Sequence, residues 1–91
     1  MIRSFRHRGL KELFLNGHSR RVAPDLHGRC LLRLDALDNA ERPGDLQVPG
    51  FDFHRLRGRP VRYSIHVNGP WCITFEFADG DAWRVDLENY H

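Results

Sequence analysis

An alternation of apolar and polar residues runs through the last third of the chain, from Val61 to His91. Three stretches share this pattern, because every second residue in them is aliphatic or aromatic: 63–67, 71–77 and 83–87. A period of two is the signature of β-strands that bury one face. The dipeptides Asn68-Gly69 and Asp79-Gly80 interrupt the pattern, and both are strong hairpin signals. The alternation therefore predicts a three-stranded antiparallel meander.

The register of this meander follows if its apolar residues share one face. Two-residue loops would put the apolar residues of neighbouring strands on opposite faces, because a shift of one residue flips every side chain. We therefore expect the three-residue loops Asn68-Gly69-Pro70 and Asp79-Gly80-Asp81. The expected pairs are Val67–Trp71, Ile65–Ile73 and Tyr63–Phe75 in the first hairpin, and Phe77–Trp83, Phe75–Val85 and Ile73–Leu87 in the second.

The other face of the meander then carries polar side chains in three rows. They are Arg62, Glu76 and Arg84; Ser64, Thr74 and Asp86; and His66, Cys72 and Glu88. Such a face either meets water or forms a concave site. In the second interpretation, the chemistry lies at the third row and the terminal Asn89-Tyr90-His91.

Two amphipathic helices are expected ahead of the sheet. Leu10, Leu13 and Phe14 recur at helical spacing, and Gly17 can end that helix. A second helix is expected to begin at Pro24 and to end near Asp38-Asn39. Its apolar stripe comprises Leu26, Cys30, Leu34 and Leu37, widened by His27 and Leu31. Short strands are also expected at 2–5 and 53–57. The fold class predicted is α+β, with two N-terminal helices packed on the odd-numbered face of a mostly antiparallel sheet.

Length and composition limit the classes of protein to which this chain can belong. Ninety-one residues suit one domain, since domains usually contain about 50 to 200 residues. No apolar run approaches the roughly 18 residues of a membrane-spanning helix, and the N-terminus lacks the apolar core of a signal peptide. Cys30 and Cys72 have no CxxC spacing, so we expect reduced thiols in a cytoplasmic protein with no membrane partner.

Positive charge is concentrated in the first two-thirds of the chain. Residues 1–62 contain thirteen basic and seven acidic side chains, whereas residues 63–91 contain one basic and five acidic side chains. Thirteen of the fourteen basic residues are arginine, whose planar guanidinium suits phosphate. A nucleic-acid partner explains this bias, and so does a GC-rich genome that replaces lysine with arginine.

Six histidines make a metal site the first chemistry to test. None of them pairs at ligand spacing with another histidine or with a cysteine, so we expect neither a metal nor a cofactor. The hexapeptide Phe53-His54-Arg55-Leu56-Arg57-Gly58 is more suggestive. Histidine moves protons near neutral pH, and arginine stabilises charge on phosphate. A solvated surface strand explains the same hexapeptide when it is taken alone.

The order and spacing of several short motifs resemble the HigB-type killer toxins of the RelE superfamily, which cleave messenger RNA on the ribosome. The resemblance runs nearly from end to end, and implies a RelE-like sheet within a single toxin domain over residues 1–91. The motifs are Met1-Ile2-Arg3-Ser4-Phe5, Gly9-Leu10-Lys11-Glu12-Leu13-Phe14, Ala36-Leu37-Asp38-Asn39-Ala40 through Asp45-Leu46 and Pro49-Gly50, His54-Arg55-Leu56-Arg57-Gly58, the stretch from Ser64 to Phe75, and Asn89-Tyr90-His91.

The resemblance implies the toxin of a type II toxin–antitoxin system, a ribosome-dependent mRNA endoribonuclease that inhibits translation. Its implied partners are a HigA-type helix-turn-helix antitoxin, the ribosome and messenger RNA, with DNA contacted only through the antitoxin complex. The implied catalytic residues are His54, Asn89, Tyr90 and His91, and Arg55, Arg57 and Arg84 are expected to balance phosphate charge. His91 or His54 is expected as general base, and the other histidine or Tyr90 as general acid. The strand with His54 must then lie alongside the last residues of the chain.

Three residues depart from the family pattern, which has aspartate at Asn89, arginine at Cys72 and lysine at Arg57. The change at Arg57 keeps the charge, whereas the other two remove an acid and a cation from one corner of the expected site. Removing one such group typically costs about a hundredfold or more in rate. A second interpretation is therefore a family member with weakened catalysis that mainly binds the antitoxin or the ribosome. A third is a plain nucleic-acid-binding domain that uses the basic first two-thirds.

Overall fold

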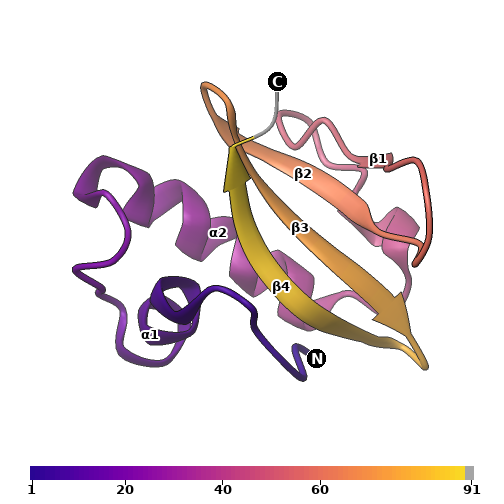
Figure 1. Ribbon diagram of the computed structural model, residues 1–91, viewed down its shortest axis with the longest axis horizontal. Coiled ribbons are helices and arrows are strands. Elements are labelled where there is room, and N and C mark those ends of the chain that lie inside the picture. Colours follow the sequence, from indigo (N-terminus) through magenta and orange to yellow (C-terminus); the bar gives the residue numbers. More distant parts are fainter. Residues whose placement is uncertain (90–91) are drawn as a thin grey trace.

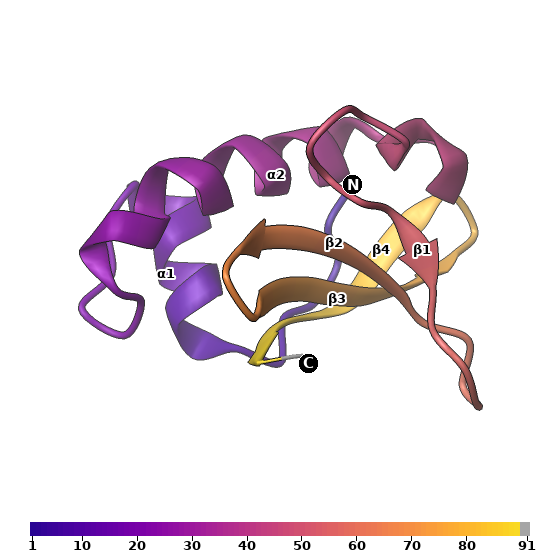
Figure 2. The same cartoon turned by 90° about the horizontal axis from the view of Figure 1, so that it is seen from above.

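The computed structural model describes residues 1–89 of the chain. Its elements are α1 (Arg8–Asn16), η1 (Pro24–Leu26), α2 (His27–Asn39), η2 (Pro43–Leu46), β1 (His54–Arg55), β2 (Tyr63–Asn68), β3 (Trp71–Ala78) and β4 (Asp81–Asn89), where η marks a 3-10 helix. The strands form one antiparallel sheet in the order β1-β2-β3-β4. The predicted α+β class is confirmed, and α2 lies across one face of the sheet (Figure 1; Figure 2).

Helix α1 begins and ends where side-chain chemistry predicts. The Nδ1 atom of His7 accepts a hydrogen bond from the Leu10 N–H at 3.1 Å, which satisfies one of the free donors in the first turn. The helix ends at Gly17, whose φ of +78° is readily accessible to glycine. The Gly17 N–H donates to the Leu13 carbonyl at 2.7 Å, so the predicted end of this helix is confirmed.

Helix α2 begins later than expected. Pro24 opens a 3-10 turn rather than the α-helix itself, which runs from His27 to Asn39. The predicted end near Asp38-Asn39 is confirmed, and so is the buried stripe, since Leu26, Cys30, Leu34 and Leu37 are all buried.

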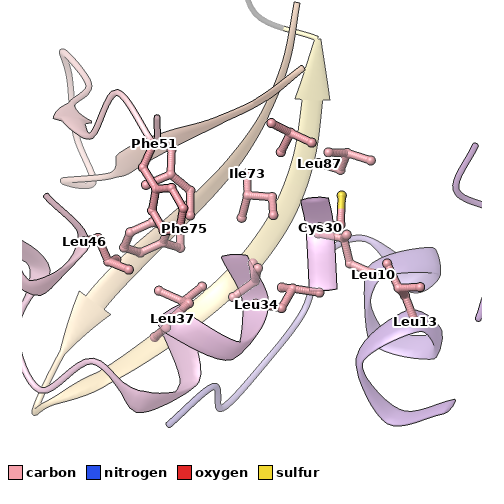
Figure 3. Packing of buried hydrophobic residues seen from close by; sticks show 14 of the residues in the cluster. Leu10, Leu13, Cys30, Leu34, Leu37, Leu46, Phe51, Ile73, Phe75 and Leu87 are labelled. Atoms are coloured by element: carbon pink, nitrogen blue, oxygen red, sulfur yellow. The ribbon is translucent and has the colours of Figure 1, made fainter. Parts of the chain in front are cut away.

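The hydrophobic core lies between the helices and the odd-numbered face of β2 and β3 (Figure 3). Its fully buried side chains include Leu10, Leu13, Leu34, Leu37, Leu46, Ile65, Ile73 and Phe75. Cys30 lies among them, and burial raises the pKa of its thiol to about 11. The thiol therefore stays protonated at neutral pH. Cys72 is also buried and unpaired, so the expectation that the two cysteines form no disulfide is confirmed.

The first hairpin follows the expected register except beside its loop. Tyr63 pairs with Phe75 and Ile65 with Ile73, as predicted. Trp71 pairs with Asn68 instead of Val67, because a bulge between His66 and Asn68 absorbs the extra residue. Val67 is still buried, so the bulge keeps the apolar face continuous without the three-residue loop that we expected.

A bulge also corrects the expected register of the second hairpin. Ile73 pairs with Leu87 as predicted, but Phe77 pairs with Ala82 rather than Trp83. Asp79 and Gly80 alone form the loop, with φ of +56° and +78°, which is the backbone that a two-residue hairpin requires. The register shifts near Arg84, whose φ is +52°. Ala82 is consequently buried, whereas the Trp83 side chain is exposed.

Strand β1 is shorter than the strand expected at 53–57. Asp52 ahead of it has a φ of +46° and Gly58 after it a φ of +103°, so the chain is extended only briefly between two turns. His54 pairs with Ser64 and Arg55 with Tyr63, and the other residues of the stretch 53–57 form no ladder pair.

The N-terminal segment that we expected as a strand makes isolated parallel bridges with β4. Ile2 is bridged to Ala82 and Phe5 to Val85, so residues 2–5 cover the edge of β4 that β3 leaves open. The arrangement places β4 between this segment and β3.

Candidate functional site

A row of polar side chains crosses all four strands on the face opposite the core. Cross-strand pairing puts His54, Ser64, Thr74 and Asp86 in line, and directly opposite residues of an antiparallel sheet project to the same face. We call this the His54 row. It contains the expected Ser64–Thr74–Asp86 row, which is confirmed, and adds His54 at its end.

A second row lies two residues further along the strands and contains His66, Cys72 and Glu88. This Glu88 row is also as predicted. The expected row of Arg62, Glu76 and Arg84 is not formed, because the bulge near Arg84 pairs Glu76 with Trp83. Arg84 still reaches the Glu76 carboxylate at 3.7 Å, across the exposed end of the sheet.

The imidazole of His54 is exposed, and its orientation is fixed by a local hydrogen bond. Its Nδ1 atom lies 2.9 Å from the Asp52 carbonyl oxygen, which can only accept. A neutral His54 ring therefore carries its proton on Nδ1 and its lone pair on Nε2. That tautomer can take a proton from a substrate at Nε2.

The short strand β1 is held by contacts at both of its ends. Before it, the Phe51 carbonyl accepts from the His66 N–H at 2.6 Å, and after it, the Leu56 N–H donates to the Arg62 carbonyl at 2.9 Å. Phe53 stacks on Tyr63 with 5.6 Å between ring centres. These contacts fix the segment that carries His54, although it has only two ladder pairs of its own.

Arg62 joins the His54 row to the Glu88 row. Its Nη1 atom lies 3.2 Å and 3.3 Å from the two Glu88 carboxylate oxygens and 3.4 Å from the Thr74 hydroxyl. We expected Arg62 to share a row with Glu76, because a flat register considers only directly opposite residues. The diagonal contact depends on the length of the arginine side chain, and no sequence signal marks it.

The three arginines expected to bind phosphate do not gather around His54. Arg55 follows His54 in β1, so its side chain projects to the opposite face. Arg57 is exposed in the connection after β1. Arg84 occupies the bulge in β4, where its side chain is 64% exposed beside Glu76.

Asn89 ends β4 and is exposed. It pairs with Trp71, and β2 and β3 separate β4 from β1, so the strand with His54 does not lie beside the strand with Asn89 (Figure 1). The expected catalytic residues Tyr90 and His91 lie outside the described residues.

His54 is exposed at one end of its row, whereas Ser64 and Thr74 are buried within it, and the hollows found in residues 1–89 lie elsewhere. A hollow of about 560 Å³ borders the end of α1, beside Glu12, His18 and Arg20. A second, of about 350 Å³, separates α1 from the N-terminal segment and is lined in part by Phe5 and Phe14. Residues 1–89 contain no cluster of three potential metal ligands among His, Cys, Asp and Glu. No helix in the described part of the chain has the length and apolarity needed to cross a membrane.

Comparison with known proteins places the chain in a toxin family. A family model described as "RelE-like toxin of type II toxin-antitoxin system HigB" matches residues 3–91. The protein named endoribonuclease HigB from Proteus vulgaris is 41% identical over 92 aligned residues, and the alignment covers 100% of both chains.

Proposed function

Since this chain belongs to the HigB-like family of RelE-like type II toxins, we propose that it is an endoribonuclease that cuts messenger RNA on the ribosome and so inhibits translation. The observation that carries the proposal is its end-to-end similarity to a protein named endoribonuclease HigB. That similarity favours a cutting enzyme over a family member that only binds. It also favours the enzyme over a plain nucleic-acid-binding domain.

The reaction proposed is a transesterification within the RNA. The ribose 2′-oxygen attacks the adjacent phosphorus while a general base takes the hydroxyl proton, and the bond from phosphorus to the 5′-oxygen breaks. A general acid protonates the departing 5′-oxygen, which leaves a cyclic phosphate and a free 5′-hydroxyl. No metal or cofactor is needed for this proton transfer between side chains and substrate.

We assign the general base to His54. Its Nδ1 atom faces the Asp52 carbonyl, so a neutral ring presents the Nε2 lone pair to solvent. His91 or Tyr90 is proposed as general acid, and Asn89 as a polar group beside them. Arg55, Arg57 and Arg84 are proposed to attract the RNA backbone at longer range, as exposed cations around the sheet.

A type II toxin has an antitoxin partner. We propose that this antitoxin is of the HigA type with a helix-turn-helix, and that DNA is reached only through the complex. The toxin is proposed to act in the cytoplasm, where ribosomes translate. We further propose that residues 1–91 form one toxin domain with a RelE-like sheet.

The proposal is tested by expressing the chain and mapping the new 5′ ends of messenger RNA on translating ribosomes. We expect cuts within translated messages that are lost when His54→Ala is combined with His91→Ala. His18→Ala is the matched control, because His18 is also exposed and lies outside both rows. Absence of cuts with the unaltered protein, or identical cuts with the double variant, would show that the catalytic proposal is wrong.

A further inference from the structure

We propose that Arg62 is the phosphate-binding residue of this site, and that its guanidinium contacts the phosphate at which the RNA is cut. The inference rests on the proposed endoribonuclease function and adds to it a residue that neither the motifs nor the comparisons single out. It is carried by the place of Arg62 on the sheet, by its incomplete ion pair, and by the charge of its surroundings.

The guanidinium of Arg62 lies on the same face as His54. It contacts Thr74, which belongs to the His54 row, and Glu88, which belongs to the neighbouring row. Within residues 1–89, no other arginine side chain is hydrogen-bonded to a side chain of either row. Arg62 is therefore the cation that a hydrogen bond places at the His54 row, at its Thr74 position.

The ion pair between Arg62 and Glu88 leaves most of the guanidinium available. Arginine pairs best with a carboxylate through two parallel hydrogen bonds from two nitrogens. Here Nη1 alone makes every contact, at 3.2 to 3.4 Å, and no bond from Nε or Nη2 is found within the described residues. The Arg62 side chain is 28% exposed. The donors that are not used within residues 1–89 can thus take a phosphate without a rearrangement of the strands.

The charge of the surrounding face makes such a cation necessary. Asp86 and Glu88 both project from β4 onto this face, and Glu76 lies nearby with Arg84 as its own partner. Without Arg62 the two rows would present carboxylates to an RNA chain and repel it. The phosphate also gains negative charge when the 2′-oxygen attacks, and a fixed guanidinium stabilises that charge.

Two variants with opposite expected effects test the inference. Arg62→Gln removes the cation, so kcat/KM for cleavage of messages on programmed ribosomes should fall about a hundredfold, the scale expected for the loss of one charge-stabilising donor. Glu88→Gln is nearly isosteric and frees Arg62 from its carboxylate, so it should preserve or raise kcat/KM. If the pair serves only to hold β4, both variants should instead lose activity together.

Arg3→Gln is the matched control, because Arg3 is also an exposed arginine in an ion pair, with Asp81, far from the two rows. It should cleave like the unaltered protein, and thermal unfolding of all variants should confirm that each is folded. Cleavage by Arg62→Gln at the unaltered rate, or an equal loss in Glu88→Gln, would overturn the inference.

A binding measurement separates this inference from the proposed function. Binding to a short single-stranded RNA with 2′-O-methyl riboses needs no cleavage, and its salt dependence counts phosphate contacts, at about 0.7 in logarithmic slope for each one. Arg62→Gln should lose about one such contact even if the unaltered protein does not cut. An unchanged affinity and slope in Arg62→Gln would refute the phosphate contact, whichever way the cleavage test turns out.

Discussion

The guanidinium carbon of Arg33 lies 4.7 Å from the centre of the Phe51 ring, inside the protein. Arg33 is only 7% exposed, and within residues 1–89 no acidic side chain pairs with it. Its donors go to backbone carbonyls instead, among them those of His66 in β2 and Gly50 in the preceding connection. Burial lowers the pKa of this guanidinium, with the Arg29 charge as a further cause. Arg33 thereby joins α2, β2 and the segment that leads to His54.

Arg33→Met should destabilise the protein by about 1–3 kcal/mol, because it removes the part-buried hydrogen bonds to the His66 and Gly50 carbonyls. The measurement is the free energy of unfolding in urea. The free energy of unfolding of Arg33→Lys should lie between those of Arg33→Met and the unaltered protein, since an ammonium keeps the charge but not the planar guanidinium. Arg29→Met, on the exposed side of the same helix, is the control and should change stability by less than about 0.5 kcal/mol. Equal stability of Arg33→Met and the unaltered protein would contradict this role.

Asp81 should make the stability of the folded protein depend on pH. The hydrogen bond from Arg3, 3.0 Å long, holds the pKa of the Asp81 carboxyl below its usual range. A carboxyl whose pKa is lowered by folding stabilises the folded state at pH values above its unfolded-state pKa. This stabilisation is lost as the pH falls through the folded-state pKa. Asp81→Asn should therefore melt at a lower temperature than the unaltered protein at pH 6. The two melting temperatures should converge as the pH falls through the folded-state pKa of Asp81. A difference that persists undiminished at acidic pH would exclude this linkage.

Substitutions of Arg84 test the left-handed backbone of the bulge in β4. Its φ of +52° is unfavourable for a residue with a Cβ and most unfavourable for a β-branched one. Arg84→Val should destabilise the protein by about 1–2 kcal/mol, whereas Arg84→Gly should cost much less, because glycine adopts this backbone freely. Urea unfolding of the two variants provides the comparison. If valine and glycine proved equally tolerated, the left-handed backbone at this position would be disproved.

Asn89→Asp should raise the rate of message cleavage by about tenfold or more, on the proposed assignment of this position to the site. Asn89 is exposed at the end of β4, so the thermal stability of the variant should stay unchanged. Asn68→Asp is the control for added negative charge, because Asn68 is exposed in β2. A gain in rate shared by both variants would attribute the effect to net charge rather than to position 89.

The parts of the fold that follow from local rules could be predicted from the sequence. Gly17 ends α1 because an αL backbone is required there, and the buried stripe of α2 follows from its helical spacing. Three of the four residues of the His54 row were predicted, because alternation fixes which residues share a face. His54 joined it only through the pairing of β1 with β2, which connects segments that no local pattern relates.

The two bulges could not be predicted, because a longer loop and a bulged strand both keep the apolar residues on one face. We expected three-residue loops, but the register instead shifts near Val67 and Arg84. The bulge in β4 changes the site, because it prevents the expected row of Arg62, Glu76 and Arg84. The contact of Arg62 with Glu88 was missed for another reason, because it is a diagonal contact that depends on the length of the arginine side chain.

The bridges between residues 2–5 and β4 bear on how the protein is made. The Arg3 N–H donates to the Ala82 carbonyl, and the Arg84 N–H donates to the Ser4 hydroxyl across a sequence separation of 80. Residues 2–5 therefore stay unpaired during synthesis until β4 has been made, and long-range pairing of this kind is slow. A nascent chain that stops before β4 also lacks Asp86 and Glu88. An incomplete translation product thus has no strand with which residues 2–5 can pair, and it lacks the carboxylate that holds Arg62.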